Sequence, residues 1–230
     1  MERKLLFITS NRLGDAVLST GLLHAALQRF SPDRVTVACG PVPAPLFAGV
    51  PKLEQIILLD KARGGMHWLD LWRHCVGQKW EAVVDIRNSF VSYLVPARHV
   101  FRFIGGNPKK HKAEQLAALL NLSPAPPSKL WITESAQQKA AQLMPPGGRV
   151  LALCPTANSY RKCWPGERFV EAARRLTASG MLAGARIAVL AAGNEKEQAD
   201  PLIQELRKTH EVVDLVGKTD PLEAAACLAY

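Results

Sequence analysis

Short apolar runs alternate with amphipathic segments along the first half of the chain. The run Lys4–Ile8 has the length and composition of a buried strand, and the polar turn Ser10–Asp15 follows it. A helix is predicted from about Ala16 to Phe30, because apolar residues recur there at spacings of three and four. Further strands are predicted at Arg34–Ala38, Gln55–Leu59, Ala82–Ile86 and Val100–Ile104, and further helices at Met66–Gln78 and Lys112–Leu120. This alternation with short connections indicates an α/β fold with a mainly parallel, doubly wound sheet.

Two proline-rich stretches, Ser123–Pro127 and Met144–Gly148, interrupt the pattern, and a helix is predicted between them at Glu134–Leu143. The pattern then restarts. Strands are predicted at Val150–Cys154, Arg186–Ala191 and Glu211–Val216, and helices at Pro165–Ser179, Lys196–His210 and Pro221–Ala229. We therefore expect a first domain over residues 1–127, a linker with a helix over 128–148 and a second domain over 149–230.

The second domain has fewer strands than a usual sheet. Three strands fall below the common four to six, and the sequence stops inside an apolar helix without a Gly or Pro stop signal. The pattern thus predicts a truncated version of a longer architecture, with the second domain incomplete in this chain.

Composition places the chain among folded proteins that do not cross a membrane. Of the 230 residues, 48% are hydrophobic and 21% charged, which is ordinary globular usage. No apolar run approaches the ~20 residues needed to span a bilayer. The N-terminus carries Asn11, Arg12 and Asp15 where a secretory signal would keep its apolar stretch. A cytoplasmic protein is the expectation.

The charge is concentrated in the first half of the chain. The formal net charge is +9, from 29 basic and 20 acidic residues. Residues 1–127 hold 16 basic and 9 acidic residues (+7), and residues 128–230 hold 13 and 11 (+2). This imbalance indicates an anionic partner (nucleic acid, a membrane surface or an acidic small molecule), or simply a solvated basic surface. Nucleic-acid binding is disfavoured, because no predicted helix gathers Lys and Arg on one face and aromatic residues are only 7%.

Cysteine and glycine spacing argue against two classes of site. The five cysteines are scattered without CxxC spacing, which is typical of reduced thiols and provides no paired ligands for zinc. The GxGxxG fingerprint is absent after the first strand, where only Gly14 is present, and this disfavours a dinucleotide-dependent oxidoreductase.

The turn after the first strand contains the first candidate residue, Asp15. Open α/β sheets bind ligands at this carboxyl edge. Asp15 can serve as the N-cap of the following helix, or as a general base that takes a proton from an attacking hydroxyl. The adjacent Gly14 permits a close backbone approach or an unusual dihedral angle.

Two loops of the second domain have the composition of a nucleotide site. Thr156, Ser159, Arg161 and Lys162 precede a predicted helix N-terminus, where hydroxyls, cations and the helix dipole suit a phosphate. The alternative is an exposed polar loop with Trp164 packed in the core. After the next strand, a glycine turn leads to acidic residues that could accept hydrogen bonds from a ribose diol, or simply favour a helix N-terminus.

These sites share a recognisable layout. The sequence resembles the glycosyltransferase family 9 heptosyltransferases, which transfer heptose from ADP-heptose to the inner core of lipopolysaccharide. The resemblance covers the chain in order and rests on Asn11–Thr20, on Lys162–Pro165 with Phe169, on Gly193 followed by Glu197, and on Asp214–Thr219 before Leu222 and Glu223.

The resemblance implies a GT-B fold of two Rossmann-like domains, with the acceptor on the first and the nucleotide-sugar on the second. It implies an inverting transfer without metal or cofactor, in which Asp15 is the base. Lys162 would hold the donor diphosphate with Thr156 and Arg161 as neighbours, and Glu197 would bind the ribose. The acceptor loop would comprise Asn11, Arg12 and Gly14.

The implied partners are a nucleotide-sugar donor and an anionic lipopolysaccharide core acceptor, with peripheral contact at the inner face of the cytoplasmic membrane and no nucleic acid. Family members continue into an Asp-Ser/Thr-Gly…His segment that this sequence lacks. An alternative therefore remains: a catalytically impaired remnant that only binds a nucleotide or an acceptor.

Overall fold

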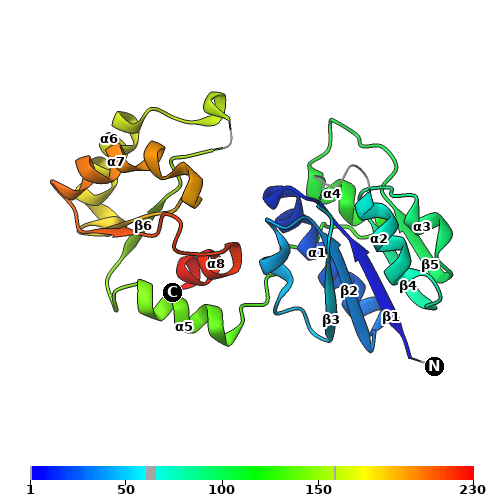
Figure 1. Ribbon diagram of the computed structural model, residues 1–230. Coiled ribbons are helices and arrows are strands. Elements are labelled where there is room, and N and C mark those ends of the chain that lie inside the picture. Colours follow the sequence, from blue (N-terminus) through cyan, green and yellow to red (C-terminus); the bar gives the residue numbers. More distant parts are fainter. Residues whose placement is uncertain (1, 61–65, 158) are drawn as a thin grey trace. The chain divides into compact units, whose positions relative to one another are not determined.

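The computed structural model describes residues 2–60, 66–157 and 159–230. The chain divides into two compact units, Met1–Trp131 (unit 1) and Ile132–Tyr230 (unit 2), and Figure 1 shows the elements of each. No helix in these described ranges is both long and apolar enough to cross a membrane.

Unit 1 contains a five-stranded parallel sheet in the order β3-β2-β1-β4-β5. Its strands are β1 (Lys4–Ile8), β2 (Arg34–Cys39), β3 (Leu53–Leu58), β4 (Trp80–Asp85) and β5 (Ala97–Arg102). Its helices are α1 (Leu13–Phe30), α2 (Met66–Cys75), α3 (Val91–Leu94) and α4 (Lys112–Ala117), with short 3-10 turns at η1 (Ala44–Phe47) and η3 (Ala118–Leu120). The direction of winding reverses between β1 and β4, which creates a crevice at the carboxyl ends of these strands.

Side chains of β1 point alternately to the two faces of the sheet and contribute to a hydrophobic core on each face. Leu5 and Phe7 face the core formed with α1 and α4, whereas Leu6 and Ile8 face the core formed with α2 and α3. All four side chains are fully buried. A central parallel strand is covered on both faces, and this explains why β1 reads as a continuous apolar run.

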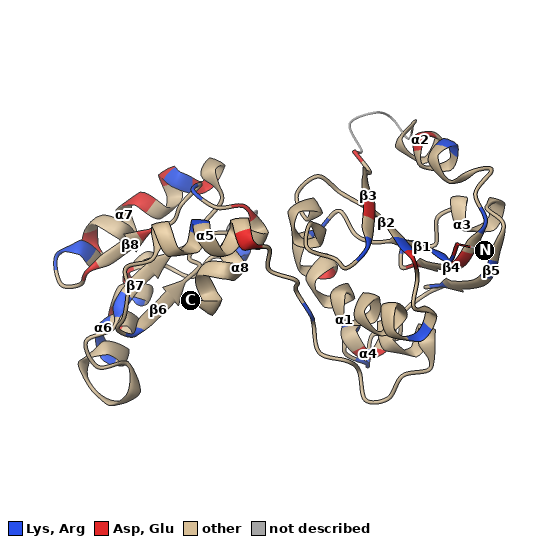
Figure 2. Cartoon of the chain, turned by 90° about the horizontal axis from the view of Figure 1, so that it is seen from below, with Lys and Arg blue, Asp and Glu red and all other residues tan. Residues whose placement is uncertain are grey.

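Unit 2 contains a three-stranded parallel sheet in the order β6-β7-β8. Its strands are β6 (Val150–Leu153), β7 (Arg186–Val189) and β8 (Val212–Asp214). Its helices are α5 (Glu134–Leu143), α6 (Gly166–Ala178), α7 (Lys196–Arg207) and α8 (Pro221–Ala229), with 3-10 turns at η4 (Tyr160–Lys162), η5 (Gly180–Leu182) and η6 (Gly193–Glu195). Helices α6 and α7 cover one face of the sheet, and α5 and α8 cover the other. Both charge signs occur on α7 (Figure 2).

Several boundaries differ from the sequence-based prediction. Helix α1 begins at Leu13 rather than Ala16, so Gly14 and Asp15 lie inside its first turn. Strand β5 begins at Ala97 rather than Val100, because its pairing with β4 starts where Trp80 lies beside Ala97. Helix α5, expected in a linker, packs on α8 of unit 2 through Ala136 and Ala140.

Candidate active site

A cavity of about 250 Å³ lies at the crevice between the carboxyl ends of β1 and β4. We call it the switch-point cavity. It is lined by Ser10, Asn11, Arg12, Asp15, Ile86, Arg87 and Lys112. Three cations and one carboxylate therefore face a space where open α/β sheets bind ligands. Sequence reasoning identified Asn11, Arg12 and Asp15 but missed Arg87 and Lys112; Arg87 had a local signal, since it directly follows the predicted strand Ala82–Ile86.

Asp15 is not the N-cap of helix α1, which corrects one of the two interpretations. The N-cap is Arg12, without a side-chain cap hydrogen bond, and Asp15 lies three residues further on. The half-buried Asp15 carboxylate has no hydrogen-bond or ion-pair partner within the described ranges. A carboxylate that lines a cavity and is not engaged in the fold is free to accept a proton from a bound hydroxyl.

For Gly14 the structure excludes one of the two interpretations, the unusual dihedral angle. Its φ is not positive, and a Cβ added there would meet nothing within 4 Å. The protein's own backbone therefore does not require glycine at this position, and an open, exposed surface remains beside Asp15.

Asn11 joins three strand ends of unit 1. Its Nδ2 donates to the Leu59 carbonyl oxygen at 2.8 Å, and its Oδ1 accepts a hydrogen bond from the Arg87 guanidinium. A Cβ on Gly40 would approach the Asn11 Cα to 2.6 Å, so the loop after β2 needs glycine to pass Asn11. Asn11 is thus held in place by the ends of β2, β3 and β4, and it positions Arg87.

Asp85 braces the loop that carries Arg87. The fully buried Asp85 carboxylate accepts hydrogen bonds from the Arg87 backbone N at 2.8 Å and from both the backbone N and the Oγ of Ser89 at 2.7 Å. Burial lowers the pKa of the Arg87 guanidinium, and the nearby Asp85 charge opposes that shift. The loop that carries Arg87 is therefore fixed by buried hydrogen bonds.

In unit 2, the loops after β6 and β7 meet at the carboxyl edge of the sheet. The Thr156 hydroxyl donates to Glu195 Oε2 at 2.6 Å, and the same oxygen accepts from the Ala192 backbone N at 3.2 Å. Further along, Gln198 Nε2 donates to Cys163 Sγ at 3.0 Å. These contacts bring the sequence-predicted loop with Lys162 beside the first turn of α7, which contains Glu197.

Three of the four residues predicted to bind the nucleotide-sugar donor are exposed at this edge. Arg161 and Lys162 lie in η4, and Glu197 lies in the first turn of α7. None of their side chains has a hydrogen-bond or ion-pair partner in the part of the chain that the structure describes. Two cations and a carboxylate are thus available to a ligand that carries both phosphate and diol groups.

The loop after β8 completes the edge with a close glycine contact. Gly217 has φ +66, and a Cβ built there would lie 2.8 Å from the Gly193 Cα. Glu223, which belongs to the sequence motif after β8, forms a capping box with Asp220 at the start of α8. Sequence reasoning counted Glu195 among the acidic residues after the glycine turn at Gly193 but missed its hydrogen bond with Thr156, a residue 39 positions away.

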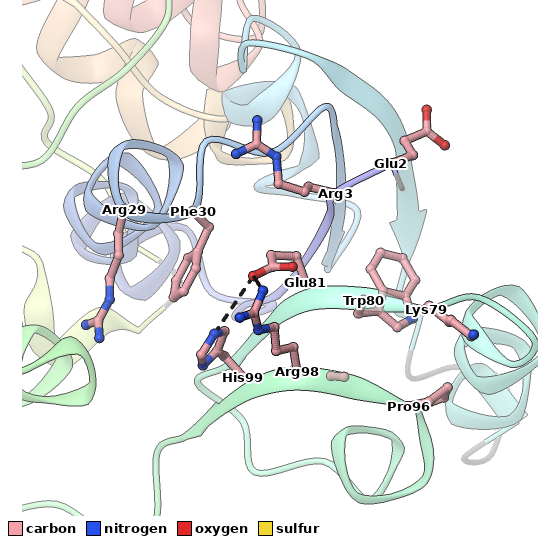
Figure 3. Close-up of a pocket in the computed structure, with 11 residues that line it drawn as sticks. Glu2, Arg3, Arg29, Phe30, Lys79, Trp80, Glu81, Pro96, Arg98 and His99 are labelled. Atoms are coloured by element: carbon pink, nitrogen blue, oxygen red, sulfur yellow. Dashed lines mark ion pairs between the residues drawn. The ribbon is translucent and has the colours of Figure 1, made fainter.

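A larger groove of about 890 Å³ lies at the opposite, amino edge of the unit 1 sheet (Figure 3). Its lining includes Glu81, whose carboxylate lies 3.6 Å from Arg98 and 3.8 Å from His99. Glu81 is thus held by neighbouring residues of the groove, and none of the sequence-predicted site residues lies here. We therefore place the candidate site at the carboxyl edges, not in this larger groove.

Comparison with solved structures supports the same fold. A glycosyl transferase family 9 protein from Veillonella parvula DSM 2008 matches with TM-score 0.79 and 15% identity, over 98% of this chain and 73% of that chain. E. coli ADP-heptose lps heptosyltransferase II matches with TM-score 0.71 and 15% identity, over 98% and 76%. E. coli heptosyltransferase WaaC with ADP-2-deoxy-2-fluoro heptose matches with TM-score 0.68 and 18% identity, over 98% and 80%. The expected fold class, α/β with two parallel sheets of the GT-B type, is confirmed.

The two sequence comparisons, with curated proteins and with family profiles, gave different results. No curated protein matches the chain significantly. The family profile described as Glycosyltransferase family 9 (heptosyltransferase) matches residues 109–230, which is more than half of the chain. The resemblance first seen in the motifs is confirmed, and the chain belongs to glycosyltransferase family 9, the heptosyltransferase family.

Proposed function

We propose that this chain transfers a heptose from ADP-heptose to an anionic acceptor of the lipopolysaccharide inner core, with inversion and without a metal ion. The observation that supports this most directly is the unpartnered Asp15 carboxylate in a cavity whose other charged lining residues are the cations Arg12, Arg87 and Lys112. The family provides the glycosyl-transfer chemistry, and E. coli WaaC, a structural neighbour, was solved with ADP and with an ADP-heptose analogue.

In the proposed step, Asp15 accepts the proton of an acceptor hydroxyl while that oxygen attacks the anomeric carbon of the heptose. The bond between the anomeric carbon and the β-phosphate oxygen breaks, and ADP leaves with the electron pair. Arg12, Arg87 and Lys112 would attract the negative groups of the acceptor to the cavity. With one carboxylate and three cations, the lining of the cavity has a net positive charge and does not repel an anionic acceptor.

Unit 2 would bind the donor. The exposed side chains of Arg161 and Lys162 would neutralise the diphosphate and the charge that develops on the leaving ADP. Glu197 would accept hydrogen bonds from the ribose hydroxyls. Thr156 would act mainly through Glu195, because its hydroxyl proton is already donated to that carboxylate.

The protein would work at the cytoplasmic face of the inner membrane, where a lipid-linked acceptor is available. The excess of +7 over residues 1–127 favours an anionic partner for this part of the chain. No nucleic acid is part of the proposal.

The test is an ADP-release assay with ADP-heptose and a deep-core acceptor, comparing the parent with Asp15→Asn. Loss of the base should lower kcat by about 10²–10⁴-fold. ADP affinity, measured by calorimetry, should stay unchanged, because Asp15 lies in unit 1 and the proposed donor residues lie in unit 2. Wild-type turnover by Asp15→Asn would remove the base assignment. A parent that binds ADP but transfers no heptose would instead favour the binding-only alternative.

A further inference from the structure

Helices α2 and α3 expose a patch of large apolar side chains on unit 1. Its members are Met66, Leu69, Phe90, Tyr93 and Leu94, between 38% and 57% exposed, and we call it the α2–α3 patch. The two helices pack against each other, and Figure 1 shows them on the same side of the sheet. The Trp68 ring lies 6.5 Å from the Phe90 ring and links the two halves of the patch. Exposed apolar surface of this kind, bordered by polar residues, marks an interaction site.

Cations border this patch directly. The Arg102 guanidinium lies 3.8 Å from the centroid of the Tyr93 ring, and Arg87 lies 5.2 Å from the centroid of the Trp68 ring. Arg73 is one helical turn beyond Leu69 on the exposed face of α2, with Asp70 at 3.6 Å as its acidic neighbour. Three arginines against two carboxylates, those of Asp70 and the buried Asp85, leave the surroundings of the patch net positive, which complements an anionic surface.

The patch also adjoins the switch-point cavity. Arg87 belongs to both, since it lines the cavity with Asp15 and stacks on Trp68 beneath the patch. The surface is apolar and aromatic, is bordered by cations and adjoins the switch-point cavity. These properties fit the interfacial region of a bilayer. Apolar side chains would enter the headgroup boundary, and the arginines would bind lipid phosphates.

We propose that the α2–α3 patch is the surface through which this protein binds an anionic phospholipid bilayer. The inference deepens the proposed function, on which it rests, because it names the face that would receive a lipid-linked acceptor at Asp15. Docking here would bring the anionic headgroup of that acceptor to the arginine side of the cavity.

The test is co-sedimentation of the full chain with vesicles of phosphatidylglycerol and phosphatidylcholine, and with vesicles of phosphatidylcholine alone. The parent should bind the anionic vesicles and lose most of this binding on neutral vesicles or at high salt. The double variant Phe90→Ser/Leu94→Ser should reduce the partition coefficient by about tenfold or more, since half-exposed apolar groups are removed from the contact.

A matched control lies in unit 2. Leu176 and Met181 are 49% and 82% exposed, and Leu176→Ser/Met181→Ser should bind vesicles as the parent does. Transfer to a water-soluble, delipidated core oligosaccharide should be the same in the parent and in Phe90→Ser/Leu94→Ser, which confirms that the variant is folded. Absence of transfer in the parent would contradict the proposed function. It would not affect the vesicle result, which tests the membrane surface separately.

Three results would overturn the proposal. One is equal binding of the parent to neutral and anionic vesicles. Another is parent-like binding by Phe90→Ser/Leu94→Ser. The third is a parent that binds neither kind of vesicle.

Discussion

The hydroxyl of Thr156 lies 2.6 Å from a carboxylate oxygen of Glu195, although the two residues are on different loops of unit 2. The same carboxylate oxygen accepts a hydrogen bond from the Ala192 backbone N. A threonine hydroxyl has a single proton to donate, so Thr156 cannot donate to a phosphate while it donates to Glu195. The pair holds the two loops together, and the cations of η4 are left as the residues available to the donor.

Thr156 and Lys162 should therefore respond differently to substitution. Thr156→Val should lower the free energy of unfolding by about 1 kcal/mol through loss of one half-buried hydrogen bond, with a small effect on ADP affinity. Lys162→Ala should leave stability unchanged and weaken ADP binding by about 10- to 100-fold, the range for a hydrogen bond to a charged group. Thermal unfolding and calorimetry with ADP measure the two effects. Equal loss of ADP affinity in both variants would contradict this division of roles.

Arg87 should determine the affinity for an anionic acceptor. Arg87→Gln removes the cation that Asn11 and the Asp85-braced loop hold in the switch-point cavity. We expect the acceptor KM to rise about tenfold or more, with little change in the KM for ADP-heptose. The matched control is Arg98→Gln at the amino edge of the same sheet, which should leave both KM values unchanged. An acceptor KM that Arg87→Gln does not alter would exclude Arg87 from acceptor binding.

Gly217 should tolerate no side chain. Its φ is +66, and a Cβ at this position would lie 2.8 Å from the Gly193 Cα, so Gly217→Ala must shift the backbone of one of the two loops. The free energy of unfolding should fall by about 1–3 kcal/mol. ADP binding should also weaken, because the loops at the carboxyl edge of the unit 2 sheet are displaced. Gly166→Ala is the control: nothing lies within 4 Å of that Cβ, and stability should stay the same or rise slightly. Chemical denaturation of the two variants decides the point.

Most of the fold could be predicted from the sequence because buried parallel strands and long amphipathic helices give strong local signals. The run Lys4–Ile8 coincides with β1 at both ends. The sequence signals are weaker for the edge strand β5 and for the short helix α3. The predicted start of β5 is three residues late because Arg98 and His99 are exposed polar residues of an edge strand, and α3 is too short to show a periodicity.

The candidate site is only partly predictable, since its key contacts join distant segments. Asn11 and Arg87 are 76 residues apart, and only the order of the strands brings them together. The start of α1 at Leu13 depends on backbone geometry, with Arg12 as an N-cap that lacks a side-chain acceptor. Residues next to strand ends can therefore be identified from sequence, and the partners that position them cannot.

Cysteine labelling should locate the donor site through the protection that ADP gives. Burial raises the pKa of the Cys39 and Cys75 thiols to about 12, so at pH 8 almost no thiolate is present and both should resist iodoacetamide in the folded protein. Raising the pH towards 9 should not change this, because it remains far below that pKa. Cys163 is half-buried beside Lys162 and should react faster than the buried Cys39 and Cys75.

ADP should slow the labelling of Cys163 if the diphosphate binds Lys162, because the bound nucleotide covers the loop that both residues share. Mass spectrometry of peptides after timed alkylation measures the rate at each cysteine. Lys162→Ala should remove the protection by ADP, and unfolding in urea should make all five cysteines reactive as the control for complete labelling. Unchanged labelling of Cys163 at an ADP concentration that saturates binding would place the nucleotide away from this loop.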